Sequence, residues 1–322
     1  MIQWIPTGYL EYASRMSIRA GVGFANFPFK SAKAYLDFAR FCDVSGIDSI
    51  WQTDRLQSEE PFLEAMSALA VVAGTTQKIK FGMNAVVVGF RDPLVLAKQC
   101  ATIDYLSGGR LLPVFGIGAP ASPEWKATGR ETKNRGKAAN EALEIIRRLW
   151  TEESVTFEGE FYQYRGASIS PRPVQNPLPL WIGGSSPAAQ RRTATLGTGW
   201  IGGLNTPDEV GETIRGIQGE LKTNGRYIDP DHFGASIPFH IGDASDVDIE
   251  SQYLGQAARN AGLNMDDVFA VGEPERISDR LNQYVAQGAS KIVLFPAVED
   301  EESIMHQTRL LVDKVLPNVE DR

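Results

Sequence analysis

The side chains best able to take part in catalysis lie at the ends of short apolar runs in the sequence. Asp54 and Arg55 directly follow the run 49–53, and His240 lies near the end of the run 234–241. A carboxylate, a guanidinium and an imidazole together offer charge stabilisation and proton transfer. Structural roles would explain the same residues: Asp54 and Arg55 as a salt-bridged or helix-capping pair, and His240 as a hydrogen-bonded core histidine. Both interpretations stay open for these three candidate catalytic residues.

A second segment has the pattern of a phosphate-binding turn. An apolar run ends at Gly183 and Gly184, and Ser185 and Ser186 follow immediately before a predicted helix. Serine is a favoured N-cap residue. Glycines let an anion approach the backbone, and the free N–H groups of a first helical turn point toward it. These four residues are candidate phosphate contacts, although an ordinary capped strand-to-helix turn has the same pattern.

Gly116 and Gly118 belong to a G-x-G-x-x-A pattern that follows another apolar run. Pro120 and Pro123 interrupt the helix that a dinucleotide site needs, so we favour a barrel strand that ends in close backbone contacts. The chain has neither a P-loop sequence nor a nucleophile elbow. Its three histidines show no metal-ligand spacing, so no metal centre is expected.

These residues need a scaffold that gathers strand ends in one place. Apolar runs rich in β-branched residues alternate with helical apolar spacing throughout the chain, which predicts parallel strands with helical crossovers. Eight such repeats predict a (β/α)8 TIM barrel, whose active sites lie at the carboxyl ends of the strands. A doubly wound sheet is the alternative. The eight runs cover residues 20–26, 48–53, 79–88, 111–117, 179–183, 199–203, 234–241 and 290–296.

We expect one domain over residues 1–322, because no composition shift or linker marks a boundary. The length beyond a typical barrel falls in an N-terminal extension, 1–18, and in an insertion, 118–178. The insertion contains a predicted helix, 134–151, and a predicted hairpin, 155–164. We expect it to lie over the carboxyl-terminal mouth of the barrel as part of a lid.

Composition excludes several classes of partner. The 322 residues include 40 acidic and 32 basic side chains, a formal net charge of −8, and no dense block of Lys and Arg, so nucleic acid is not an expected partner. No apolar stretch approaches the roughly 20 residues that a membrane span needs. The N-terminal segment lacks the apolar core of a signal peptide. With only two cysteines, Cys42 and Cys100, we expect a cytoplasmic protein with reduced core thiols.

Taken together, several segments resemble the bacterial luciferase-like superfamily, which contains flavin-dependent monooxygenases and deazaflavin-dependent oxidoreductases. The segments run in the family's order over nearly the whole chain. They are Gly46–Asp54, Ile79–Val88, Arg91–Gln99, Thr102–Arg110, Phe157–Tyr162 and Trp181–Ala189.

The resemblance implies a barrel that binds reduced FMN or the deazaflavin coenzyme F420 at the strand ends. It makes the residues 183–186 contacts of the cofactor phosphate, and it places a non-proline cis peptide between Asn84 and Ala85, beside the cofactor ring. The family commonly has Asp-His where this chain has Asp54 and Arg55. This chain therefore lacks the histidine to which the family's usual acid–base role belongs.

The function that the resemblance implies first is that of a two-component FMNH2-dependent monooxygenase of a small organic substrate. A separate flavin reductase would supply the reduced cofactor. The chain would form a homodimer. In that interpretation Arg55 would stabilise an anion, Asp54 would hold Arg55 or a cofactor hydroxyl, and His240 would relay a proton. An F420-dependent hydride-transfer oxidoreductase is the alternative, and a non-catalytic flavin-binding barrel is a further one.

Overall fold

A computed structural model describes residues 18–319, so the expected extension 1–18 lies, except for Ile18, outside the described residues. Parallel strands form the predicted TIM barrel. One barrel position is shared by two short strands, β3 and β4. The barrel strands are β1 (Arg19–Phe24), β2 (Ser49–Gln52), β3 (Lys80–Met83), β4 (Val86–Val87), β5 (Val114–Gly116), β8 (Trp181–Gly183), β9 (Gly199–Ile201), β10 (Phe233–Ile241) and β12 (Lys291–Pro296).

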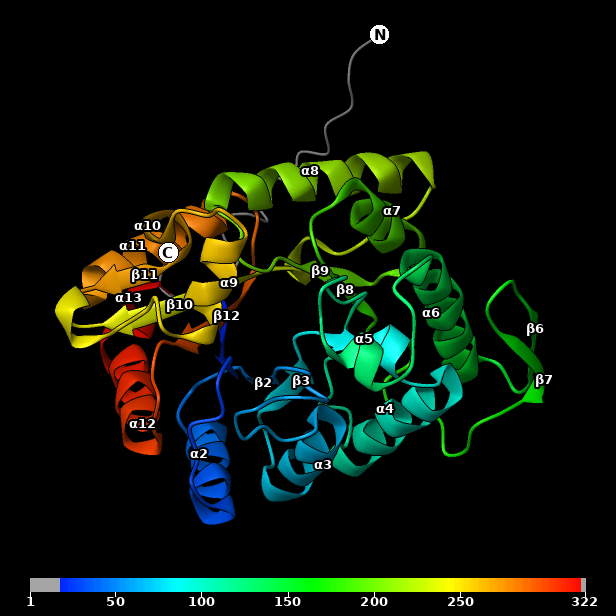
Figure 1. The fold of residues 1–322 in the computed structure, drawn as a ribbon, viewed down its shortest axis with the longest axis horizontal. Coiled ribbons are helices and arrows are strands. Elements are labelled where there is room, and N and C mark those ends of the chain that lie inside the picture. Colours follow the sequence, from blue (N-terminus) through cyan, green and yellow to red (C-terminus); the bar gives the residue numbers. More distant parts are fainter. Residues whose placement is uncertain (1–17, 320–322) are drawn as a thin grey trace, which may run out of the picture.

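The sheet closes on itself, which rules out the open doubly wound alternative. Its strand order is β3-β2-β1-β12-β10-β9-β8-β5-β4, and β4 continues the chain from β3. A parallel bridge between Phe81 and Leu111 also joins β3 to the segment before β5. Figure 1 looks onto the barrel mouth, with the strands at the centre and the helices around them.

Helices surround the barrel in chain order, and from α2 to α11 each packs against the next, while α12 packs against α2 (Figure 1). The predicted helix 134–151 is confirmed as α6. The surrounding helices are α2 (Ala32–Val44), α3 (Ala65–Thr75), α4 (Pro93–Ser107), α6 (Arg135–Thr151), α7 (Pro187–Leu196), α8 (Pro207–Thr223), α11 (Pro274–Ala286) and α12 (Glu301–Leu310).

Alternating residues explain how the barrel is filled. On β1, Val22 and Phe24 face the helices and belong to the main core, whereas Gly21 and Gly23 face the interior. A Cβ at Gly21 would lie 2.5 Å from the Trp51 indole nitrogen, and one at Gly23 would lie 2.5 Å from the Phe295 ring. Large interior side chains therefore fit because small residues stand opposite them.

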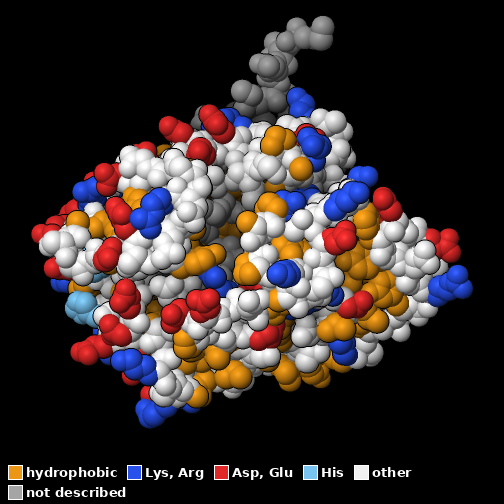
Figure 2. Space-filling view, viewed as in Figure 1, with side chains coloured by type: hydrophobic (Ala, Val, Ile, Leu, Met, Phe, Trp, Pro, Cys, Tyr) orange, Lys and Arg blue, Asp and Glu red, His pale blue; other side chains and the backbone are white. Residues whose placement is uncertain are grey.

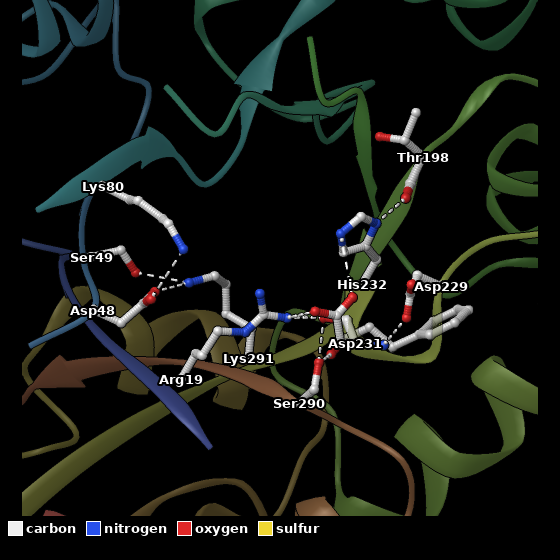
Figure 3. Close-up of polar contacts among 11 residues, drawn as sticks. Arg19, Asp48, Ser49, Lys80, Thr198, Asp229, Asp231, His232, Ser290 and Lys291 are labelled. Carbon is white, nitrogen blue, oxygen red and sulfur yellow. Dashed lines mark hydrogen bonds and ion pairs between the residues drawn. The ribbon is translucent and has the colours of Figure 1, made fainter. Parts of the chain in front are cut away.

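A polar network occupies the amino-terminal end of the barrel, opposite the mouth (Figure 3). The Lys291 ammonium, on β12, pairs with the Asp48 carboxylate and donates to the Ser49 hydroxyl at 3.2 Å. Nearby, Arg19 pairs with Asp231 at 3.1 Å. Burial lowers the pKa of Lys291 to about 8, although Asp48 opposes the shift. This network joins the first residues of β1, β2 and β12.

The insertion 118–178 divides into two parts. The short helix α5 (Glu124–Ala127) follows the mouth end of β5, and Trp125 packs edge to face on Phe90. The predicted hairpin is confirmed as β6 (Val155–Glu158) and β7 (Gln163–Ala167), but it lies beside α4 and α6 on the outer side of the barrel (Figure 1). That the first part acts as a lid stays a prediction.

A further long connection, residues 242–273, lies between β10 and α11 and was not expected from the sequence. It contains α9 (Tyr253–Asn260), α10 (Met265–Val268) and the short strand β11 (Ala270–Gly272), which pairs with β10 off the barrel path. Leu254, on α9, packs against the side chains that fill the barrel. This connection therefore covers part of the mouth.

Among residues 18–319, no helix has the length and apolar character that crossing a membrane requires.

Candidate functional site

Asp54 lies at the mouth end of β2, where an internal ion pair holds it. Both of its oxygens accept hydrogen bonds from the Arg91 guanidinium, at 2.7 and 2.8 Å, and one also accepts from the Val87 backbone N–H at 3.0 Å. Arg91 binds Glu64 as well, at 2.6 Å. The Asp54 side chain is fully buried. Its geometry is that of a residue that fixes the loops around the mouth.

Arg55 points elsewhere, although it is the next residue. Its guanidinium lies 3.4 Å from the centre of the Tyr253 ring and 5.8 Å from that of Phe62. Tyr253 begins α9, so this contact ties the β2 loop to the segment that covers the mouth. The expected interaction of Asp54 with Arg55 is replaced by separate partners for each residue.

His240 is buried at the mouth end of β10. Its Nδ1 has no hydrogen-bond partner within the described residues. Burial lowers the pKa of His240, and the Asp246 carboxylate partly opposes this. Within β10, Ser236 faces the barrel interior, where its hydroxyl accepts a hydrogen bond from the Asn84 side chain at 2.8 Å. Ile237, Phe239 and Ile241, which alternate with Ser236 along β10, belong to the main core.

Three small residues form a smooth patch across neighbouring strands. The peptide bond between Asn84 and Ala85 is cis, as the resemblance implies, and it separates β3 from β4. A Cβ placed on Gly116 would lie 3.5 Å from the Ala85 Cβ, and one on Gly183 would lie 3.6 Å from it. Ala85, Gly116 and Gly183 are therefore side by side, and any larger side chain at the two glycines would fill the space beside them.

The predicted phosphate turn adjoins this patch. Gly184 has φ of +96°, a left-handed conformation that favours glycine. The Ser186 hydroxyl caps α7 by accepting from the Ala189 N–H at 3.3 Å, and Pro187 occupies the first helical turn. Ser185 is 2.8 Å from the Asn205 side-chain oxygen. The turn thus brings two hydroxyls and a helix amino terminus to the mouth end of β8.

Arg135, which was not selected from the sequence, lies beside the segment that follows β5. It begins α6, and its Nε donates to the Gly118 carbonyl at 3.3 Å. It also lines a cleft of about 420 Å³ with Arg130 and Lys133. Gly118 follows β5, the strand that pairs with β8, so this mostly basic cleft adjoins the strand next to the one that carries the phosphate turn. The closely spaced basic residues Arg130, Lys133 and Arg135 were the feature of the sequence that could have indicated this cleft.

A larger cavity of about 550 Å³ opens at another part of the mouth. Figure 2 shows this face hollowed near its centre, beside α9. The cavity is lined by segments that follow β1, β2, β10 and β12, including Phe27, Arg55, Glu60, Tyr253 and Glu299. Its volume falls within the range of about 300–1,000 Å³ that is usual for small-molecule sites.

A family model described as luciferase-like monooxygenase matches residues 12–261. The chain belongs to the luciferase-like monooxygenase family. The barrel mouth described above is therefore the candidate active site of a luciferase-like family member.

Curated relatives of this luciferase-like protein include two named F420-dependent glucose-6-phosphate dehydrogenase. The protein of Kineococcus radiotolerans is 32% identical over 173 residues, which cover 51% of this chain and 50% of that one. The protein of Intrasporangium calvum is 34% identical over 172 residues, which cover 48% of this chain and 49% of that one. The matched region thus spans about half the length of these relatives.

Solved structures of the family share the fold over nearly the whole chain. An F420-dependent secondary alcohol dehydrogenase, in complex with an F420-acetone adduct, superposes with a TM-score of 0.81, 18% identity and coverage of 95% of this chain and 100% of that one. The oxygenating constituent of 3,6-diketocamphane monooxygenase from Pseudomonas putida, in complex with FMN, superposes with a TM-score of 0.76 and 19% identity. The superposition covers 94% of this chain and 99% of that one. At such identities the likeness concerns the fold.

Proposed function

We propose that this protein is an F420-dependent oxidoreductase that transfers hydride between the coenzyme and a small organic substrate. The names of the curated relatives support this alternative over the FMNH2-dependent monooxygenase that the sequence analysis placed first. In the structure, the main support for a bound planar coenzyme is the patch of Ala85, Gly116 and Gly183 beside the phosphate turn.

The residues present fit a flat, phosphorylated coenzyme. The small residues of the patch leave a surface free of side chains, which a planar ring requires for close contact. Gly184, Ser185, Ser186 and the first turn of α7 would hold the phosphate. Arg135 would add a charge-assisted contact. When bound, F420 supplies the group that accepts or donates the hydride.

His240 is the residue that we propose to move the substrate proton. A lowered pKa keeps its imidazole neutral at neutral pH, so the ring can accept a proton. The Nδ1 atom is buried and has no hydrogen-bond partner among the described residues, so a proton gained by the ring breaks no existing contact at that atom. Arg55 cannot take this role, because a guanidinium keeps its proton in proteins.

Coenzyme titrations test the proposal directly. Purified protein is titrated with F420 and with FMN, binding is followed by fluorescence, and oxygen uptake is measured with FMNH2. We expect F420 to bind at least about tenfold more tightly than FMN, a difference of about 1.4 kcal/mol, without oxygen uptake. Tighter FMN binding with oxygen consumption would favour the monooxygenase, and FMN retention without turnover would favour the non-catalytic barrel.

Gly184→Val tests the phosphate turn. We expect it to weaken coenzyme binding by about 1–3 kcal/mol, because a β-branched side chain blocks the backbone and leaves polar groups unpaired. Binding is measured by fluorescence titration. Gly225→Val is the matched control, since Gly225 also has a positive φ, +62°, and lies in open space just after the C-cap of α8. Equal losses of affinity in both variants would contradict the assignment.

We also propose that the chain forms a homodimer through α3 and α4. Large apolar side chains stay exposed on these helices, among them Val71, Val95 and Leu106, and Figure 2 shows apolar side chains gathered along that edge. Leu106, with 61% of its surface exposed, is the best single test. We expect Leu106→Glu to shift the mass measured by light scattering from dimer toward monomer. A monomeric parent protein would contradict the proposal.

A further inference from the structure

Arg55 has an unusual combination of position and partners. It follows β2 at the barrel mouth, lines the cavity of about 550 Å³, and lies on the face of the Tyr253 ring. Within residues 18–319 it has no ion pair and no hydrogen bond, whereas its neighbour Asp54 is fully engaged by Arg91. A free guanidinium in a substrate-sized cavity calls for a partner that is not part of the described chain.

The stacking leaves the hydrogen-bonding edge of Arg55 unused. A guanidinium that lies flat on an aromatic ring keeps its N–H groups in the plane, pointing away from the ring. Tyr253 and Phe62 also restrict the rotamers of the side chain, so less entropy is lost when a ligand binds. The geometry that matches such a fixed fork is a planar carboxylate held through paired hydrogen bonds.

The remaining lining limits the charge of the ligand. Glu60 and Glu299 also line the cavity, and they repel a second anionic group. Hydroxyl and amide groups of Ser58, Gln252 and Gln256 offer neutral hydrogen bonds, while Phe27 and Phe62 offer apolar contact. A ligand with one carboxylate and an otherwise uncharged body fits this set.

We propose that Arg55 is the specificity residue of the substrate cavity and that the substrate is a small organic acid with a single carboxylate. The inference rests on the proposed function, since it names the substrate class of that oxidoreductase. Arg55 binds and orients the carboxylate, and Tyr253 holds Arg55 in place.

A binding experiment without coenzyme tests this. Benzoate, benzamide and benzylamine are alike in shape and differ in charge, and their affinities are measured by calorimetry. We expect benzoate to bind at least about tenfold more tightly than either other probe. Arg55→Gln should abolish the preference and Arg55→Lys should retain part of it. Arg309→Gln is the matched control, because Arg309 also stacks on a ring, Phe41 at 5.5 Å, and lies outside this cavity.

Several results would overturn the proposal: equal affinity for benzoate and benzamide, tighter binding of benzylamine, no binding of benzoate, or a preference that survives Arg55→Gln. Melting temperatures of all variants are compared first, and we expect Arg55→Gln to stay close to the parent. Failure of the proposed function would instead appear as a lack of F420 binding in the coenzyme titration. The two failures are therefore distinguishable.

Discussion

Asp54→Asn is expected to lower the free energy of unfolding by about 3 kcal/mol. The change removes the charge that pairs with Arg91, whose side chain is only 9% exposed. Removing one member of a buried ion pair costs about 3–5 kcal/mol, because the other charge stays buried without its partner. We place the expected loss at the low end, since Glu64 still binds Arg91. Urea denaturation followed by circular dichroism measures it.

Glu64→Gln provides the matched control for Asp54→Asn. Glu64 binds the same guanidinium, but its side chain is 35% exposed, and partly exposed pairs contribute only about 0–1 kcal/mol. The two variants should therefore differ by about 2 kcal/mol. If Asp54→Asn were as stable as the parent while its turnover fell, Asp54 would be a catalytic residue instead of a positioning one.

Asp48→Asn is expected to cost about 3–5 kcal/mol at about pH 6, and less at about pH 9. At the lower pH, Lys291 is charged in the parent, and Asp48 is the carboxylate that pairs with this buried charge. The pKa of Lys291, lowered to about 8, falls further in the variant, because Asp48 raises it. Between the lower pKa of Lys291 in the variant and its pKa of about 8 in the parent, the folded parent binds more protons than the folded variant, so the difference in stability shrinks as pH rises.

Unfolding of parent and variant at several pH values checks this expectation. Asp231→Asn is a useful comparison, because Asp231 pairs with Arg19 in the same region but its side chain is 39% exposed. Its cost should be about 0–1 kcal/mol and should show no decline toward pH 9, since arginine does not titrate there. A cost for Asp48→Asn that stays constant from pH 6 to about pH 9 would contradict the role of Lys291.

The barrel could be predicted from the sequence because its evidence is local and repeated. Each apolar run with β-branched residues specifies a strand, and eight of them in alternation with helices leave few folds. The cis peptide that separates β3 from β4 was expected from the family resemblance, between Asn84 and Ala85. Strand β11 was missed because its three residues are too short to show a period.

The partners of the candidate residues could not be predicted, because they depend on distant parts of the chain. Asp54 meets Arg91, 37 positions away, and Arg55 meets Tyr253 on a segment that was not recognised as covering the mouth. Adjacent residues in a sequence suggest a pair, but at the end of a strand consecutive side chains point in opposite directions. The patch of Ala85, Gly116 and Gly183 likewise exists only once the three strands align.

The pairing of β1 with β12 has a consequence for synthesis of the chain. The two strands lie at opposite ends of the sequence, and Lys291 meets Asp48 across 243 positions. A ribosome must therefore make the chain through Pro296 before β1 gains its second neighbour. Until then β1 and β10 each present an unpaired edge, and such edges are prone to join other chains. A nascent chain of this protein should accordingly be a client of chaperones that shield strand edges until the last strand emerges.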